Sequence, residues 1–188
     1  ALIVAGVGSV VVRVRTAGVE SFSLGPGATA AQLTRVNDAA PRLALTDQTG
    51  REVTLESSRG RPVLVAFAFA HCQTVCPVVV REALEAQRAT ADRQTAVLVV
   101  TLDPWRDTPA RLPSIAAGWE LGGDAHVLSG EGDGVERVLS NWRIPRVRNE
   151  STGDRSHPAM VYVVSPAGRL VYALPGGAAA LTEAVRSL

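Results

Sequence analysis

The sequence contains no lysine, so all 19 of its basic residues are arginines. Without a lysine amine, the chain has no means of forming a Schiff base with a carbonyl substrate. Eighteen acidic residues almost balance the arginines, and the formal net charge is +1. The chain therefore carries no bulk positive charge for nucleic acid or for an anionic membrane surface, and we expect no nucleic-acid partner.

Cysteine is also scarce, with only Cys72 and Cys76, which lie four residues apart. A structural disulfide framework uses more cysteines, spread along the chain. Two cysteines within one short segment instead indicate a metal site or a redox pair. The cysteine count alone does not identify the cellular compartment.

Hydrophobic runs are short. The first, ALIVAGVGSVVV in residues 1–12, falls below the roughly 20 residues that cross a bilayer as a helix. We expect a β-strand here, with the trimmed end of a membrane anchor as the alternative, since the chain begins at Ala1 without Met. Residues 1–39 are predicted to form an N-terminal extension, either a β-hairpin or the remnant of an anchor or upstream domain. Residues 40–188 are predicted to form the main domain.

The main domain is predicted to have an α/β fold. Its apolar content, 46% of the whole chain, suits one compact domain with a sizeable core. Residues 42–55 predict a hairpin, and the apolar run 62–70 predicts a strand that is buried on both faces. A helical pattern over 78–93 and a second buried strand over 95–103 complete a βαβ unit with parallel strands.

The second half predicts further helices and a second hairpin. Thr108 and Pro109 suit the start of a helix, which Pro113 kinks or delays because proline has no backbone N–H to donate. The other predicted elements are a strand at 126–130, a helix at 134–142, a hairpin at 158–174 and a final helix at 178–188. The simplest assembly is a mixed sheet with helices on both sides.

Cys72 and Cys76 lie where a buried strand gives way to a helix. Unpaired N–H groups and the helix macrodipole favour a thiolate at such a place and lower its pKa. If residues 72–76 form a helical turn, the two side chains share one face and both sulfurs can reach one metal ion. Pro77 is compatible with this arrangement, because proline is tolerated in a first helical turn.

Three histidines could complete a metal site. His157 precedes a strong strand whose start can face the cysteine loop, and it gives a set of two thiolates and one imidazole. Soft thiolates select Cu(I), and imidazole also suits Cu(II). Zinc accepts the same ligands, but structural zinc sites take four. His71 is either a transient fourth ligand or points away, and His126 is expected to be structural or exposed.

Four segments together resemble the Sco/SenC family of copper proteins. They are LTDQTGREVTL, FAFAHCQTVCP, TLDPWRDTP and SHPAMVYVVSPAGRLVY, and the resemblance covers residues 41–188. It implies a thioredoxin-like fold and one copper ion bound by Cys72, Cys76 and His157. It also implies a periplasmic or other extracytoplasmic protein, usually held by an N-terminal anchor.

The functional role that the resemblance implies is in respiratory oxidase assembly. The chain would deliver copper to the dinuclear copper site of cytochrome c oxidase, or maintain the thiols of that site. Its partner would be the copper-site subunit or another copper chaperone. The alternative is a thiol-disulfide oxidoreductase, with Cys72 and Cys76 as a metal-free redox pair, so whether the chain is an enzyme stays open.

The sequence departs from the family pattern close to the proposed ligands. Ala70 and Gln73 replace a small polar residue and a proline, while Ser156 and Pro158 replace the aspartate and the Ser or Thr that flank the metal histidine. A metal-bound histidine needs a partner for its second nitrogen, which here would be Asp154 or a backbone carbonyl. We therefore expect altered copper affinity and redox poise, and Pro158 could be cis or trans.

The charged residues near the predicted site allow more than one interpretation. Arg143, Arg146, Arg148 and Arg155 form either a solvated loop or a docking surface for an acidic partner. We expect Asp107 to fix a loop or a helix start, and Asp103 to lie at a strand end and face a partner.

Overall fold

The computed structural model describes residues 34–145, 147–148, 155–156 and 159–188. Most of the predicted N-terminal extension, residues 1–33, lies outside this part of the chain. The described residues form a mixed sheet of eight strands in the order β1-β10-β9-β4-β5-β6-β2-β3, together with a separate two-stranded ladder. The strands of the eight-stranded sheet are β1 (Thr34–Ala39), β2 (Ala44–Asp47), β3 (Glu52–Thr54), β4 (Val63–Ala68), β5 (Ala96–Thr101), β6 (Ala125–Ser129), β9 (Val161–Val164) and β10 (Arg169–Leu174). The ladder pairs β7 (Val147–Arg148) with β8 (Arg155–Ser156).

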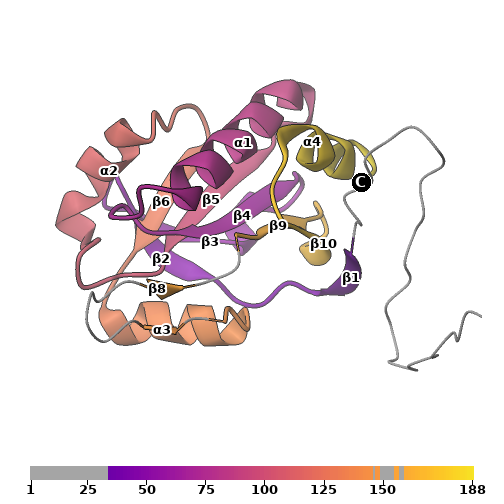
Figure 1. Cartoon of the computed structure of the whole chain (residues 1–188). Helices are drawn as coiled ribbons and strands as arrows, with labels where there is room; N and C mark the ends of the chain where they lie inside the picture. The colour runs from indigo at the N-terminus through magenta and orange to yellow at the C-terminus, as the bar shows by residue number, and fades with distance from the viewer. Residues whose placement is uncertain (1–33, 146, 149–154, 157–158) are drawn as a thin grey trace, which may run out of the picture.

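Helices cover both faces of the sheet, as predicted for this α/β fold. The α-helices are α1 (Val75–Ala89), α2 (Leu112–Gly118), α3 (Gly132–Asn141) and α4 (Ala178–Arg186), with 3-10 turns η1 (Glu56–Ser58), η2 (Ala91–Arg93) and η3 (Pro109–Arg111). Figure 1 shows α1 and α4 side by side over one face of the sheet and α3 across the other. None of the described helices is long and apolar enough to cross a membrane.

The parallel strands β4, β5 and β6 form the centre of the fold. Every residue of β4 and β5 is buried, which confirms the two-sided burial predicted from their continuous apolar runs. On the α3 side, the ring of Phe67 lies 5.6 Å from those of Trp142 and Tyr162, with edge-to-face or tilted geometry. This cluster anchors α3 against the central strands.

The predicted order of elements is confirmed along the main domain. The βαβ unit is β4-α1-β5 with parallel strands, and the two predicted hairpins are β2-β3 and β9-β10. Pro109 begins η3 and Pro113 lies in the first turn of α2. The helix therefore starts late, where the missing N–H of Pro113 breaks no helical hydrogen bond.

The N-terminal boundary of the sheet differs from the sequence-based description. Residues 34–39, which we assigned to the extension, form strand β1 and pair antiparallel with β10, from Thr34 opposite Ala173 to Ala39 opposite Arg169. The amide of Ala40 continues the ladder by donating to the carbonyl of Gly168 at 3.1 Å. Such long-range pairing leaves no local signal, because its partner lies more than 120 residues along the chain.

Candidate metal centre

The cysteine loop follows β4 at the edge where the parallel strands end. The amide of Cys72 donates to the carbonyl of Phe69 at 3.1 Å and closes a turn. Helix α1 then begins at Val75, so Cys72 precedes the helix and Cys76 lies in its first turn. Residues 72–76 therefore do not form one regular helical turn, although Pro77 lies in the first turn of α1 as predicted.

The two cysteines nevertheless come together. The backbone N–H of Cys76 donates to Sγ of Cys72 at 3.5 Å, and Oγ1 of Thr74 lies 3.7 Å from the same sulfur. Neither cysteine is part of a disulfide; Cys72 is partly exposed, whereas Cys76 is buried. A backbone amide at the helix start thus supports the Cys72 sulfur, as expected for a cysteine in this position.

The two thiols differ in acidity. Burial opposes the Cys72 thiolate, but hydrogen bonds from Cys76 and Thr74 outweigh it and lower the pKa of Cys72 to about 7. Burial raises the pKa of Cys76 to about 12, and its hydrogen bond to Cys72 and the nearby charges of Cys72 and Asp107 act in the same direction. Near neutral pH the site therefore offers one partly exposed and partly ionised thiol beside one buried, protonated thiol.

Asp107 ties the cysteine loop to the next strand. Its Oδ2 accepts from the backbone N–H of Ala70 at 3.0 Å and from the hydroxyl of Thr101 at 2.7 Å. Burial raises the pKa of this carboxyl group, against the effect of both hydrogen bonds. The loop-fixing role predicted for Asp107 is confirmed, because one oxygen joins residues from the two loops at the end of β4 and β5.

Asp103 does not present its charge to solvent. It is 5% exposed and forms an ion pair with Arg106. Its backbone N–H donates to Oγ1 of Thr101 at 3.0 Å, and its carbonyl accepts from the amide of Asp107 at 2.8 Å. The expectation that Asp103 faces a partner is therefore wrong for its side chain, which is used within the loop.

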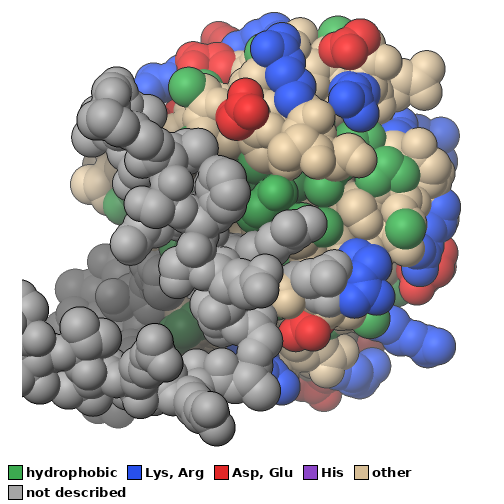
Figure 2. Space-filling view, turned by 90° about the vertical axis from the view of Figure 1, so that its right-hand side faces the viewer, with side chains coloured by type: hydrophobic (Ala, Val, Ile, Leu, Met, Phe, Trp, Pro, Cys, Tyr) green, Lys and Arg blue, Asp and Glu red, His purple; other side chains and the backbone are tan. Residues whose placement is uncertain are grey.

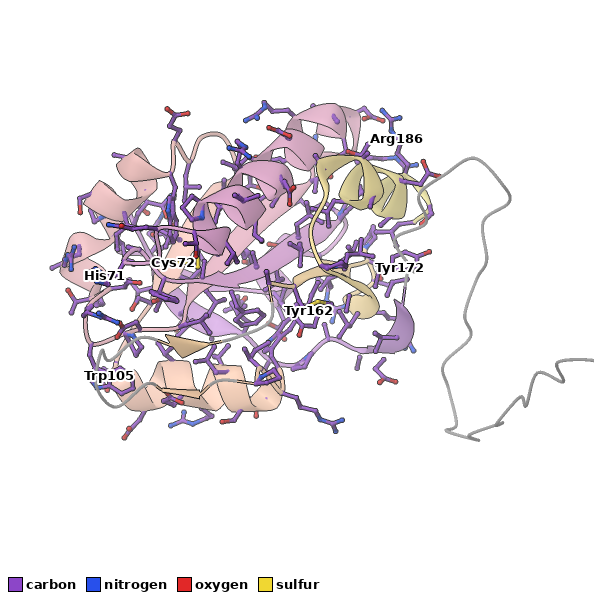
Figure 3. All side chains as sticks on the ribbon, in the orientation of Figure 1. His71, Cys72, Trp105, Tyr162, Tyr172 and Arg186 are labelled. Carbon is purple, nitrogen blue, oxygen red and sulfur yellow. The ribbon has the colours of Figure 1, made fainter. Side chains whose placement is uncertain are left out.

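The described histidines do not complete the site. His126 lies at the opposite edge, where β6 begins, and its Nδ1 and Nε2 lie 3.0 Å from carboxylate oxygens of Asp47 and Asp124. This confirms a structural role. Figure 3 shows His71 and Cys72 at the same end of the molecule, with His71 exposed to solvent. Within the described residues, no three His, Cys, Asp or Glu side chains are arranged to hold a metal ion.

Several predicted site residues lie outside the described part of the chain. They are His157 with its neighbour Pro158, and Asp154 and Arg146. Arg143 is exposed directly after α3, and it adopts a positive φ of 51°. The ligand role of His157, the Pro158 peptide bond and the arginine docking surface thus stay predictions.

Comparison with known proteins gives the family. The sequence profile described as SCO1/SenC matches residues 31–187, which is most of the chain. The chain belongs to the SCO1/SenC family. It is 27% identical to the SCO1 protein homolog of Bacillus subtilis over 130 residues, which cover 66% of this chain and 67% of that protein. The predicted family membership is confirmed.

Solved Sco structures have the same fold. ScoI of Bradyrhizobium japonicum, solved with copper bound, is 31% identical, with a TM-score of 0.64 over 78% of this chain and 99% of that one. BsSco, in which a disulfide switch was identified, is 23% identical, with a TM-score of 0.67 over 81% and 94%. BsSco is described as a member of the Sco family of cytochrome c oxidase assembly proteins. The thioredoxin-like fold predicted for this chain is confirmed.

The sequence did not reveal all residues that shape the site. Thr74 contacts the Cys72 sulfur, and Thr101 holds both Asp107 and the amide of Asp103. Thr101 is the last residue of β5 and begins the TLDPWRDTP segment. A hydroxyl at a buried strand end, just before two aspartates, is the signal that could have identified it.

Proposed function

We propose that this SCO1/SenC protein binds one copper ion as cargo through Cys72, Cys76 and His157, and delivers it to the dinuclear copper site of cytochrome c oxidase. The observation that supports this most is the convergence of two thiols at a helix start, where the Cys76 amide lies 3.5 Å from the Cys72 sulfur. The family is one of oxidase assembly proteins, and its Bradyrhizobium japonicum member was solved with copper.

The chemistry of the described donors fits copper. Two thiolates are soft ligands, which select Cu(I) over harder divalent ions. Cys72 is partly exposed and can be reached from solvent or by a partner, while Cys76 is held beneath it in the first turn of α1. A three-ligand site leaves a coordination position open for a ligand from the protein that receives the copper.

The sheet supports His157 as the third ligand. Val161, the first residue of β9, pairs with Ala66 near the end of β4, so β9 begins at the edge where the cysteine loop starts. His157 lies four residues before Val161. Four residues span at most about 14 Å, a reach that supports the choice of His157 as a ligand for a metal ion held at this edge.

Within this proposal, each residue has a distinct role. Cys72 gives up its proton first, because its pKa is about 7, and Cys76 is deprotonated as metal binds. Asp107 fixes the cysteine loop through Ala70 and Thr101. When a partner disulfide oxidises Cys72 and Cys76 to a disulfide, that partner takes up two electrons and two protons and the site loses both sulfur ligands, so redox state controls metal loading.

The asymmetry of the thiols supports a second candidate function. A partly exposed thiolate beside a buried thiol suits a thiol-disulfide oxidoreductase, in which Cys72 attacks a partner disulfide and Cys76 then releases the mixed disulfide. His157 distinguishes the two functions, because copper binding needs it and disulfide exchange does not.

Anaerobic titration of the reduced protein with Cu(I), against a competing chelator, tests the proposal. We expect one copper per chain, with binding abolished by Cys72→Ser. His157→Ala should weaken the affinity for Cu(I) by more than about tenfold. It removes a ligand, and even the loss of a residue that only hydrogen-bonds to a ligand costs about tenfold or more in affinity. His71→Ala is the matched control and should leave affinity unchanged.

Two results would contradict this proposal. If His157→Ala binds copper as tightly as the wild type, His157 is not a ligand. If the wild type takes up no copper but still reduces a disulfide substrate, the oxidoreductase function is favoured over copper delivery.

The proposed location is extracytoplasmic, with attachment to a membrane. A structurally similar SCO1/SenC family protein of Bacillus anthracis is described as a lipoprotein. An oxidising compartment also suits a function in which the Cys72–Cys76 pair cycles between dithiol and disulfide.

A further inference from the structure

Thr74 occupies the N-cap position of α1, between the two cysteines. Threonine is favoured at this position because its hydroxyl usually accepts a hydrogen bond from an N–H group of the first helical turn. Within α1, which the structure describes in full, the Thr74 hydroxyl makes no such bond. Its Oγ1 instead lies 3.7 Å from Sγ of Cys72. A side chain that suits a helix cap is therefore turned toward the thiol.

The sulfur of Cys72 takes the place of the cap. The backbone N–H of Cys76, the second residue of α1, donates to Cys72 Sγ at 3.5 Å. The third residue of the helix is Pro77, which has no N–H group to satisfy. The amides that an N-cap hydroxyl would serve are thus either bonded to sulfur or missing, so the Thr74 hydroxyl is available to contact the same sulfur.

Copper binding determines which of the two groups donates. In the reduced, metal-free protein either Thr74 or Cys72 can be the donor, because a thiol also carries a proton. A sulfur that binds a metal ion is a thiolate and has no proton, so only the hydroxyl can then donate. The amide of Cys76 donates to the same sulfur. One copper ligand therefore has two donors, and one of them belongs to a side chain that a substitution can remove.

Hydrogen bonds to a thiolate ligand affect the metal ion that it binds. Each donor draws electron density away from the sulfur, so the sulfur gives less of it to the metal. Cu(II) depends more on this donation than Cu(I) does, and hydrogen bonding around a cysteine sulfur is one of the factors that tune the reduction potential of copper sites. Donors on Cys72 should therefore favour Cu(I) over Cu(II).

We propose that Thr74 is a positioning residue that acts through Cys72: its hydroxyl donates to the Cys72 sulfur when copper is bound and so favours Cu(I). The inference rests on the proposed function and adds the oxidation state of the cargo. The β-branched side chain suits this role, because its restricted χ1 angle limits the entropy that is lost when the hydroxyl is held against the sulfur. Thr74 is exposed, so substitutions there leave the core intact.

Two substitutions separate the hydroxyl from the shape of the side chain. Thr74→Val replaces the hydroxyl with a methyl group of similar size, and Thr74→Ser keeps the hydroxyl. Anaerobic reductive titration of the Cu(II)-loaded proteins measures the midpoint potential of the Cu(II)/Cu(I) couple. We expect Thr74→Val to raise the dissociation constant of Cu(I) relative to that of Cu(II) by about tenfold, as for other residues that hydrogen-bond to a metal ligand. This change lowers the one-electron potential by about 59 mV.

An absorption spectrum tests the same hydrogen bond independently. The thiolate-to-Cu(II) charge-transfer band should move to lower energy in Thr74→Val, because a sulfur without the hydroxyl donor gives up an electron more readily. Thr74→Ser should have the potential and the band of the wild type. A merely structural role of Thr74 would move neither of them while one copper is still bound per chain.

Thr182→Val is the matched control, because it makes the same substitution in α4, where the Thr182 hydroxyl donates to the carbonyl of Ala178 at 2.7 Å. Figure 3 shows Arg186, the last residue of α4, and Cys72 toward opposite ends of the molecule. Figure 2 looks at the α4 end and shows arginine and acidic side chains mixed with hydrophobic ones, as on an ordinary solvated surface. The control should leave the potential and the band unchanged.

The inference fails if Thr74→Val keeps the wild-type potential and band, or if Thr74→Ser shifts them as far as Thr74→Val does. It also fails if Thr74→Val no longer binds one copper per chain, because the hydroxyl would then be needed for binding itself. Unchanged potentials with one copper per chain in every variant contradict this inference alone. A wild type that takes up no copper contradicts the proposed function as well.

Discussion

Cys72 and Cys76 lie four residues apart but differ in how readily they lose a proton. The amide of Cys76 and the hydroxyl of Thr74 stabilise the Cys72 thiolate, while burial keeps Cys76 protonated. The sequence placed both cysteines at a helix start and so predicted an acidic thiol. It did not predict which one, because that depends on how deeply each sulfur is buried.

This difference predicts the reactivity of the metal-free, reduced protein. Because the thiolate is the nucleophile, alkylation of Cys72 by iodoacetamide should accelerate as pH rises through about 7, the pKa of Cys72. Cys76 should stay almost unreactive up to pH 9, since its pKa is about 12. Peptide mass spectrometry after short reactions at a series of pH values measures both rates.

The Cys76→Ser variant provides a control for the Cys72 profile. The substitution changes the hydrogen bond from the Cys76 side chain, so the pH midpoint of Cys72 alkylation should rise. It keeps the backbone amide that supports the Cys72 sulfur, so the midpoint should stay below that of an ordinary thiol. Equal reactivity of Cys72 and Cys76 in the wild type at pH 8 would contradict the asymmetry.

At the scale of elements, the site depends on how the connection after β5 is tied to the loop after β4. One carboxylate oxygen of Asp107 accepts from Ala70 and from Thr101, and the amide of Leu102 donates to the carbonyl of Ala68 at 2.9 Å. Parallel strands end at the same edge of a sheet, so the βαβ unit already brings these two loops together.

Substitutions at Asp107 separate its hydrogen bonds from its charge. Asp107→Ala removes an acceptor from two donors and should reduce the free energy of unfolding by about 1–3 kcal/mol. Asp107→Asn keeps an oxygen for both donors and should cost less. It also removes a negative charge that raises the pKa of Cys76, so Cys76 should alkylate at lower pH than in the wild type.

Urea unfolding and the pH profile of alkylation measure these two effects. Thr101→Val is the matched control, because it removes one of the hydrogen bonds to Asp107 without changing its charge. The role assigned to this carboxylate would be contradicted if Asp107→Ala were as stable as the wild type. It would also be contradicted if Asp107→Asn left the pH profile of Cys76 alkylation unchanged.

The elements that the sequence predicted well are those with strong local patterns. The continuous apolar runs of β4 and β5 mark strands buried on both faces, and the QTG turn marks the β2-β3 hairpin. Strand β1 was missed as part of the sheet, because only its pairing with distant β10 defines it. Cys72 lies before α1 and not within it, a boundary that helix patterns alone do not resolve.

For the molecule as a whole, the two edges of the parallel strands have different functions. At the edge where the strands begin, Asp47, His126, Asp124 and Arg61 form a network of ion pairs and hydrogen bonds. At the opposite edge lie the cysteine loop and the start of β9. The first edge holds the sheet together, and the second is where we propose that copper is bound and passed on.

The central claim is that two cysteine sulfurs and the imidazole of His157 bind copper together. X-ray absorption spectroscopy of the Cu(I)-loaded wild type and of His157→Ala tests it most directly. The account predicts two sulfur ligands in both proteins, and one imidazole nitrogen in the wild type that is absent from the variant. An imidazole signal that persists in His157→Ala, or fewer than two sulfur ligands in the wild type, would contradict the account.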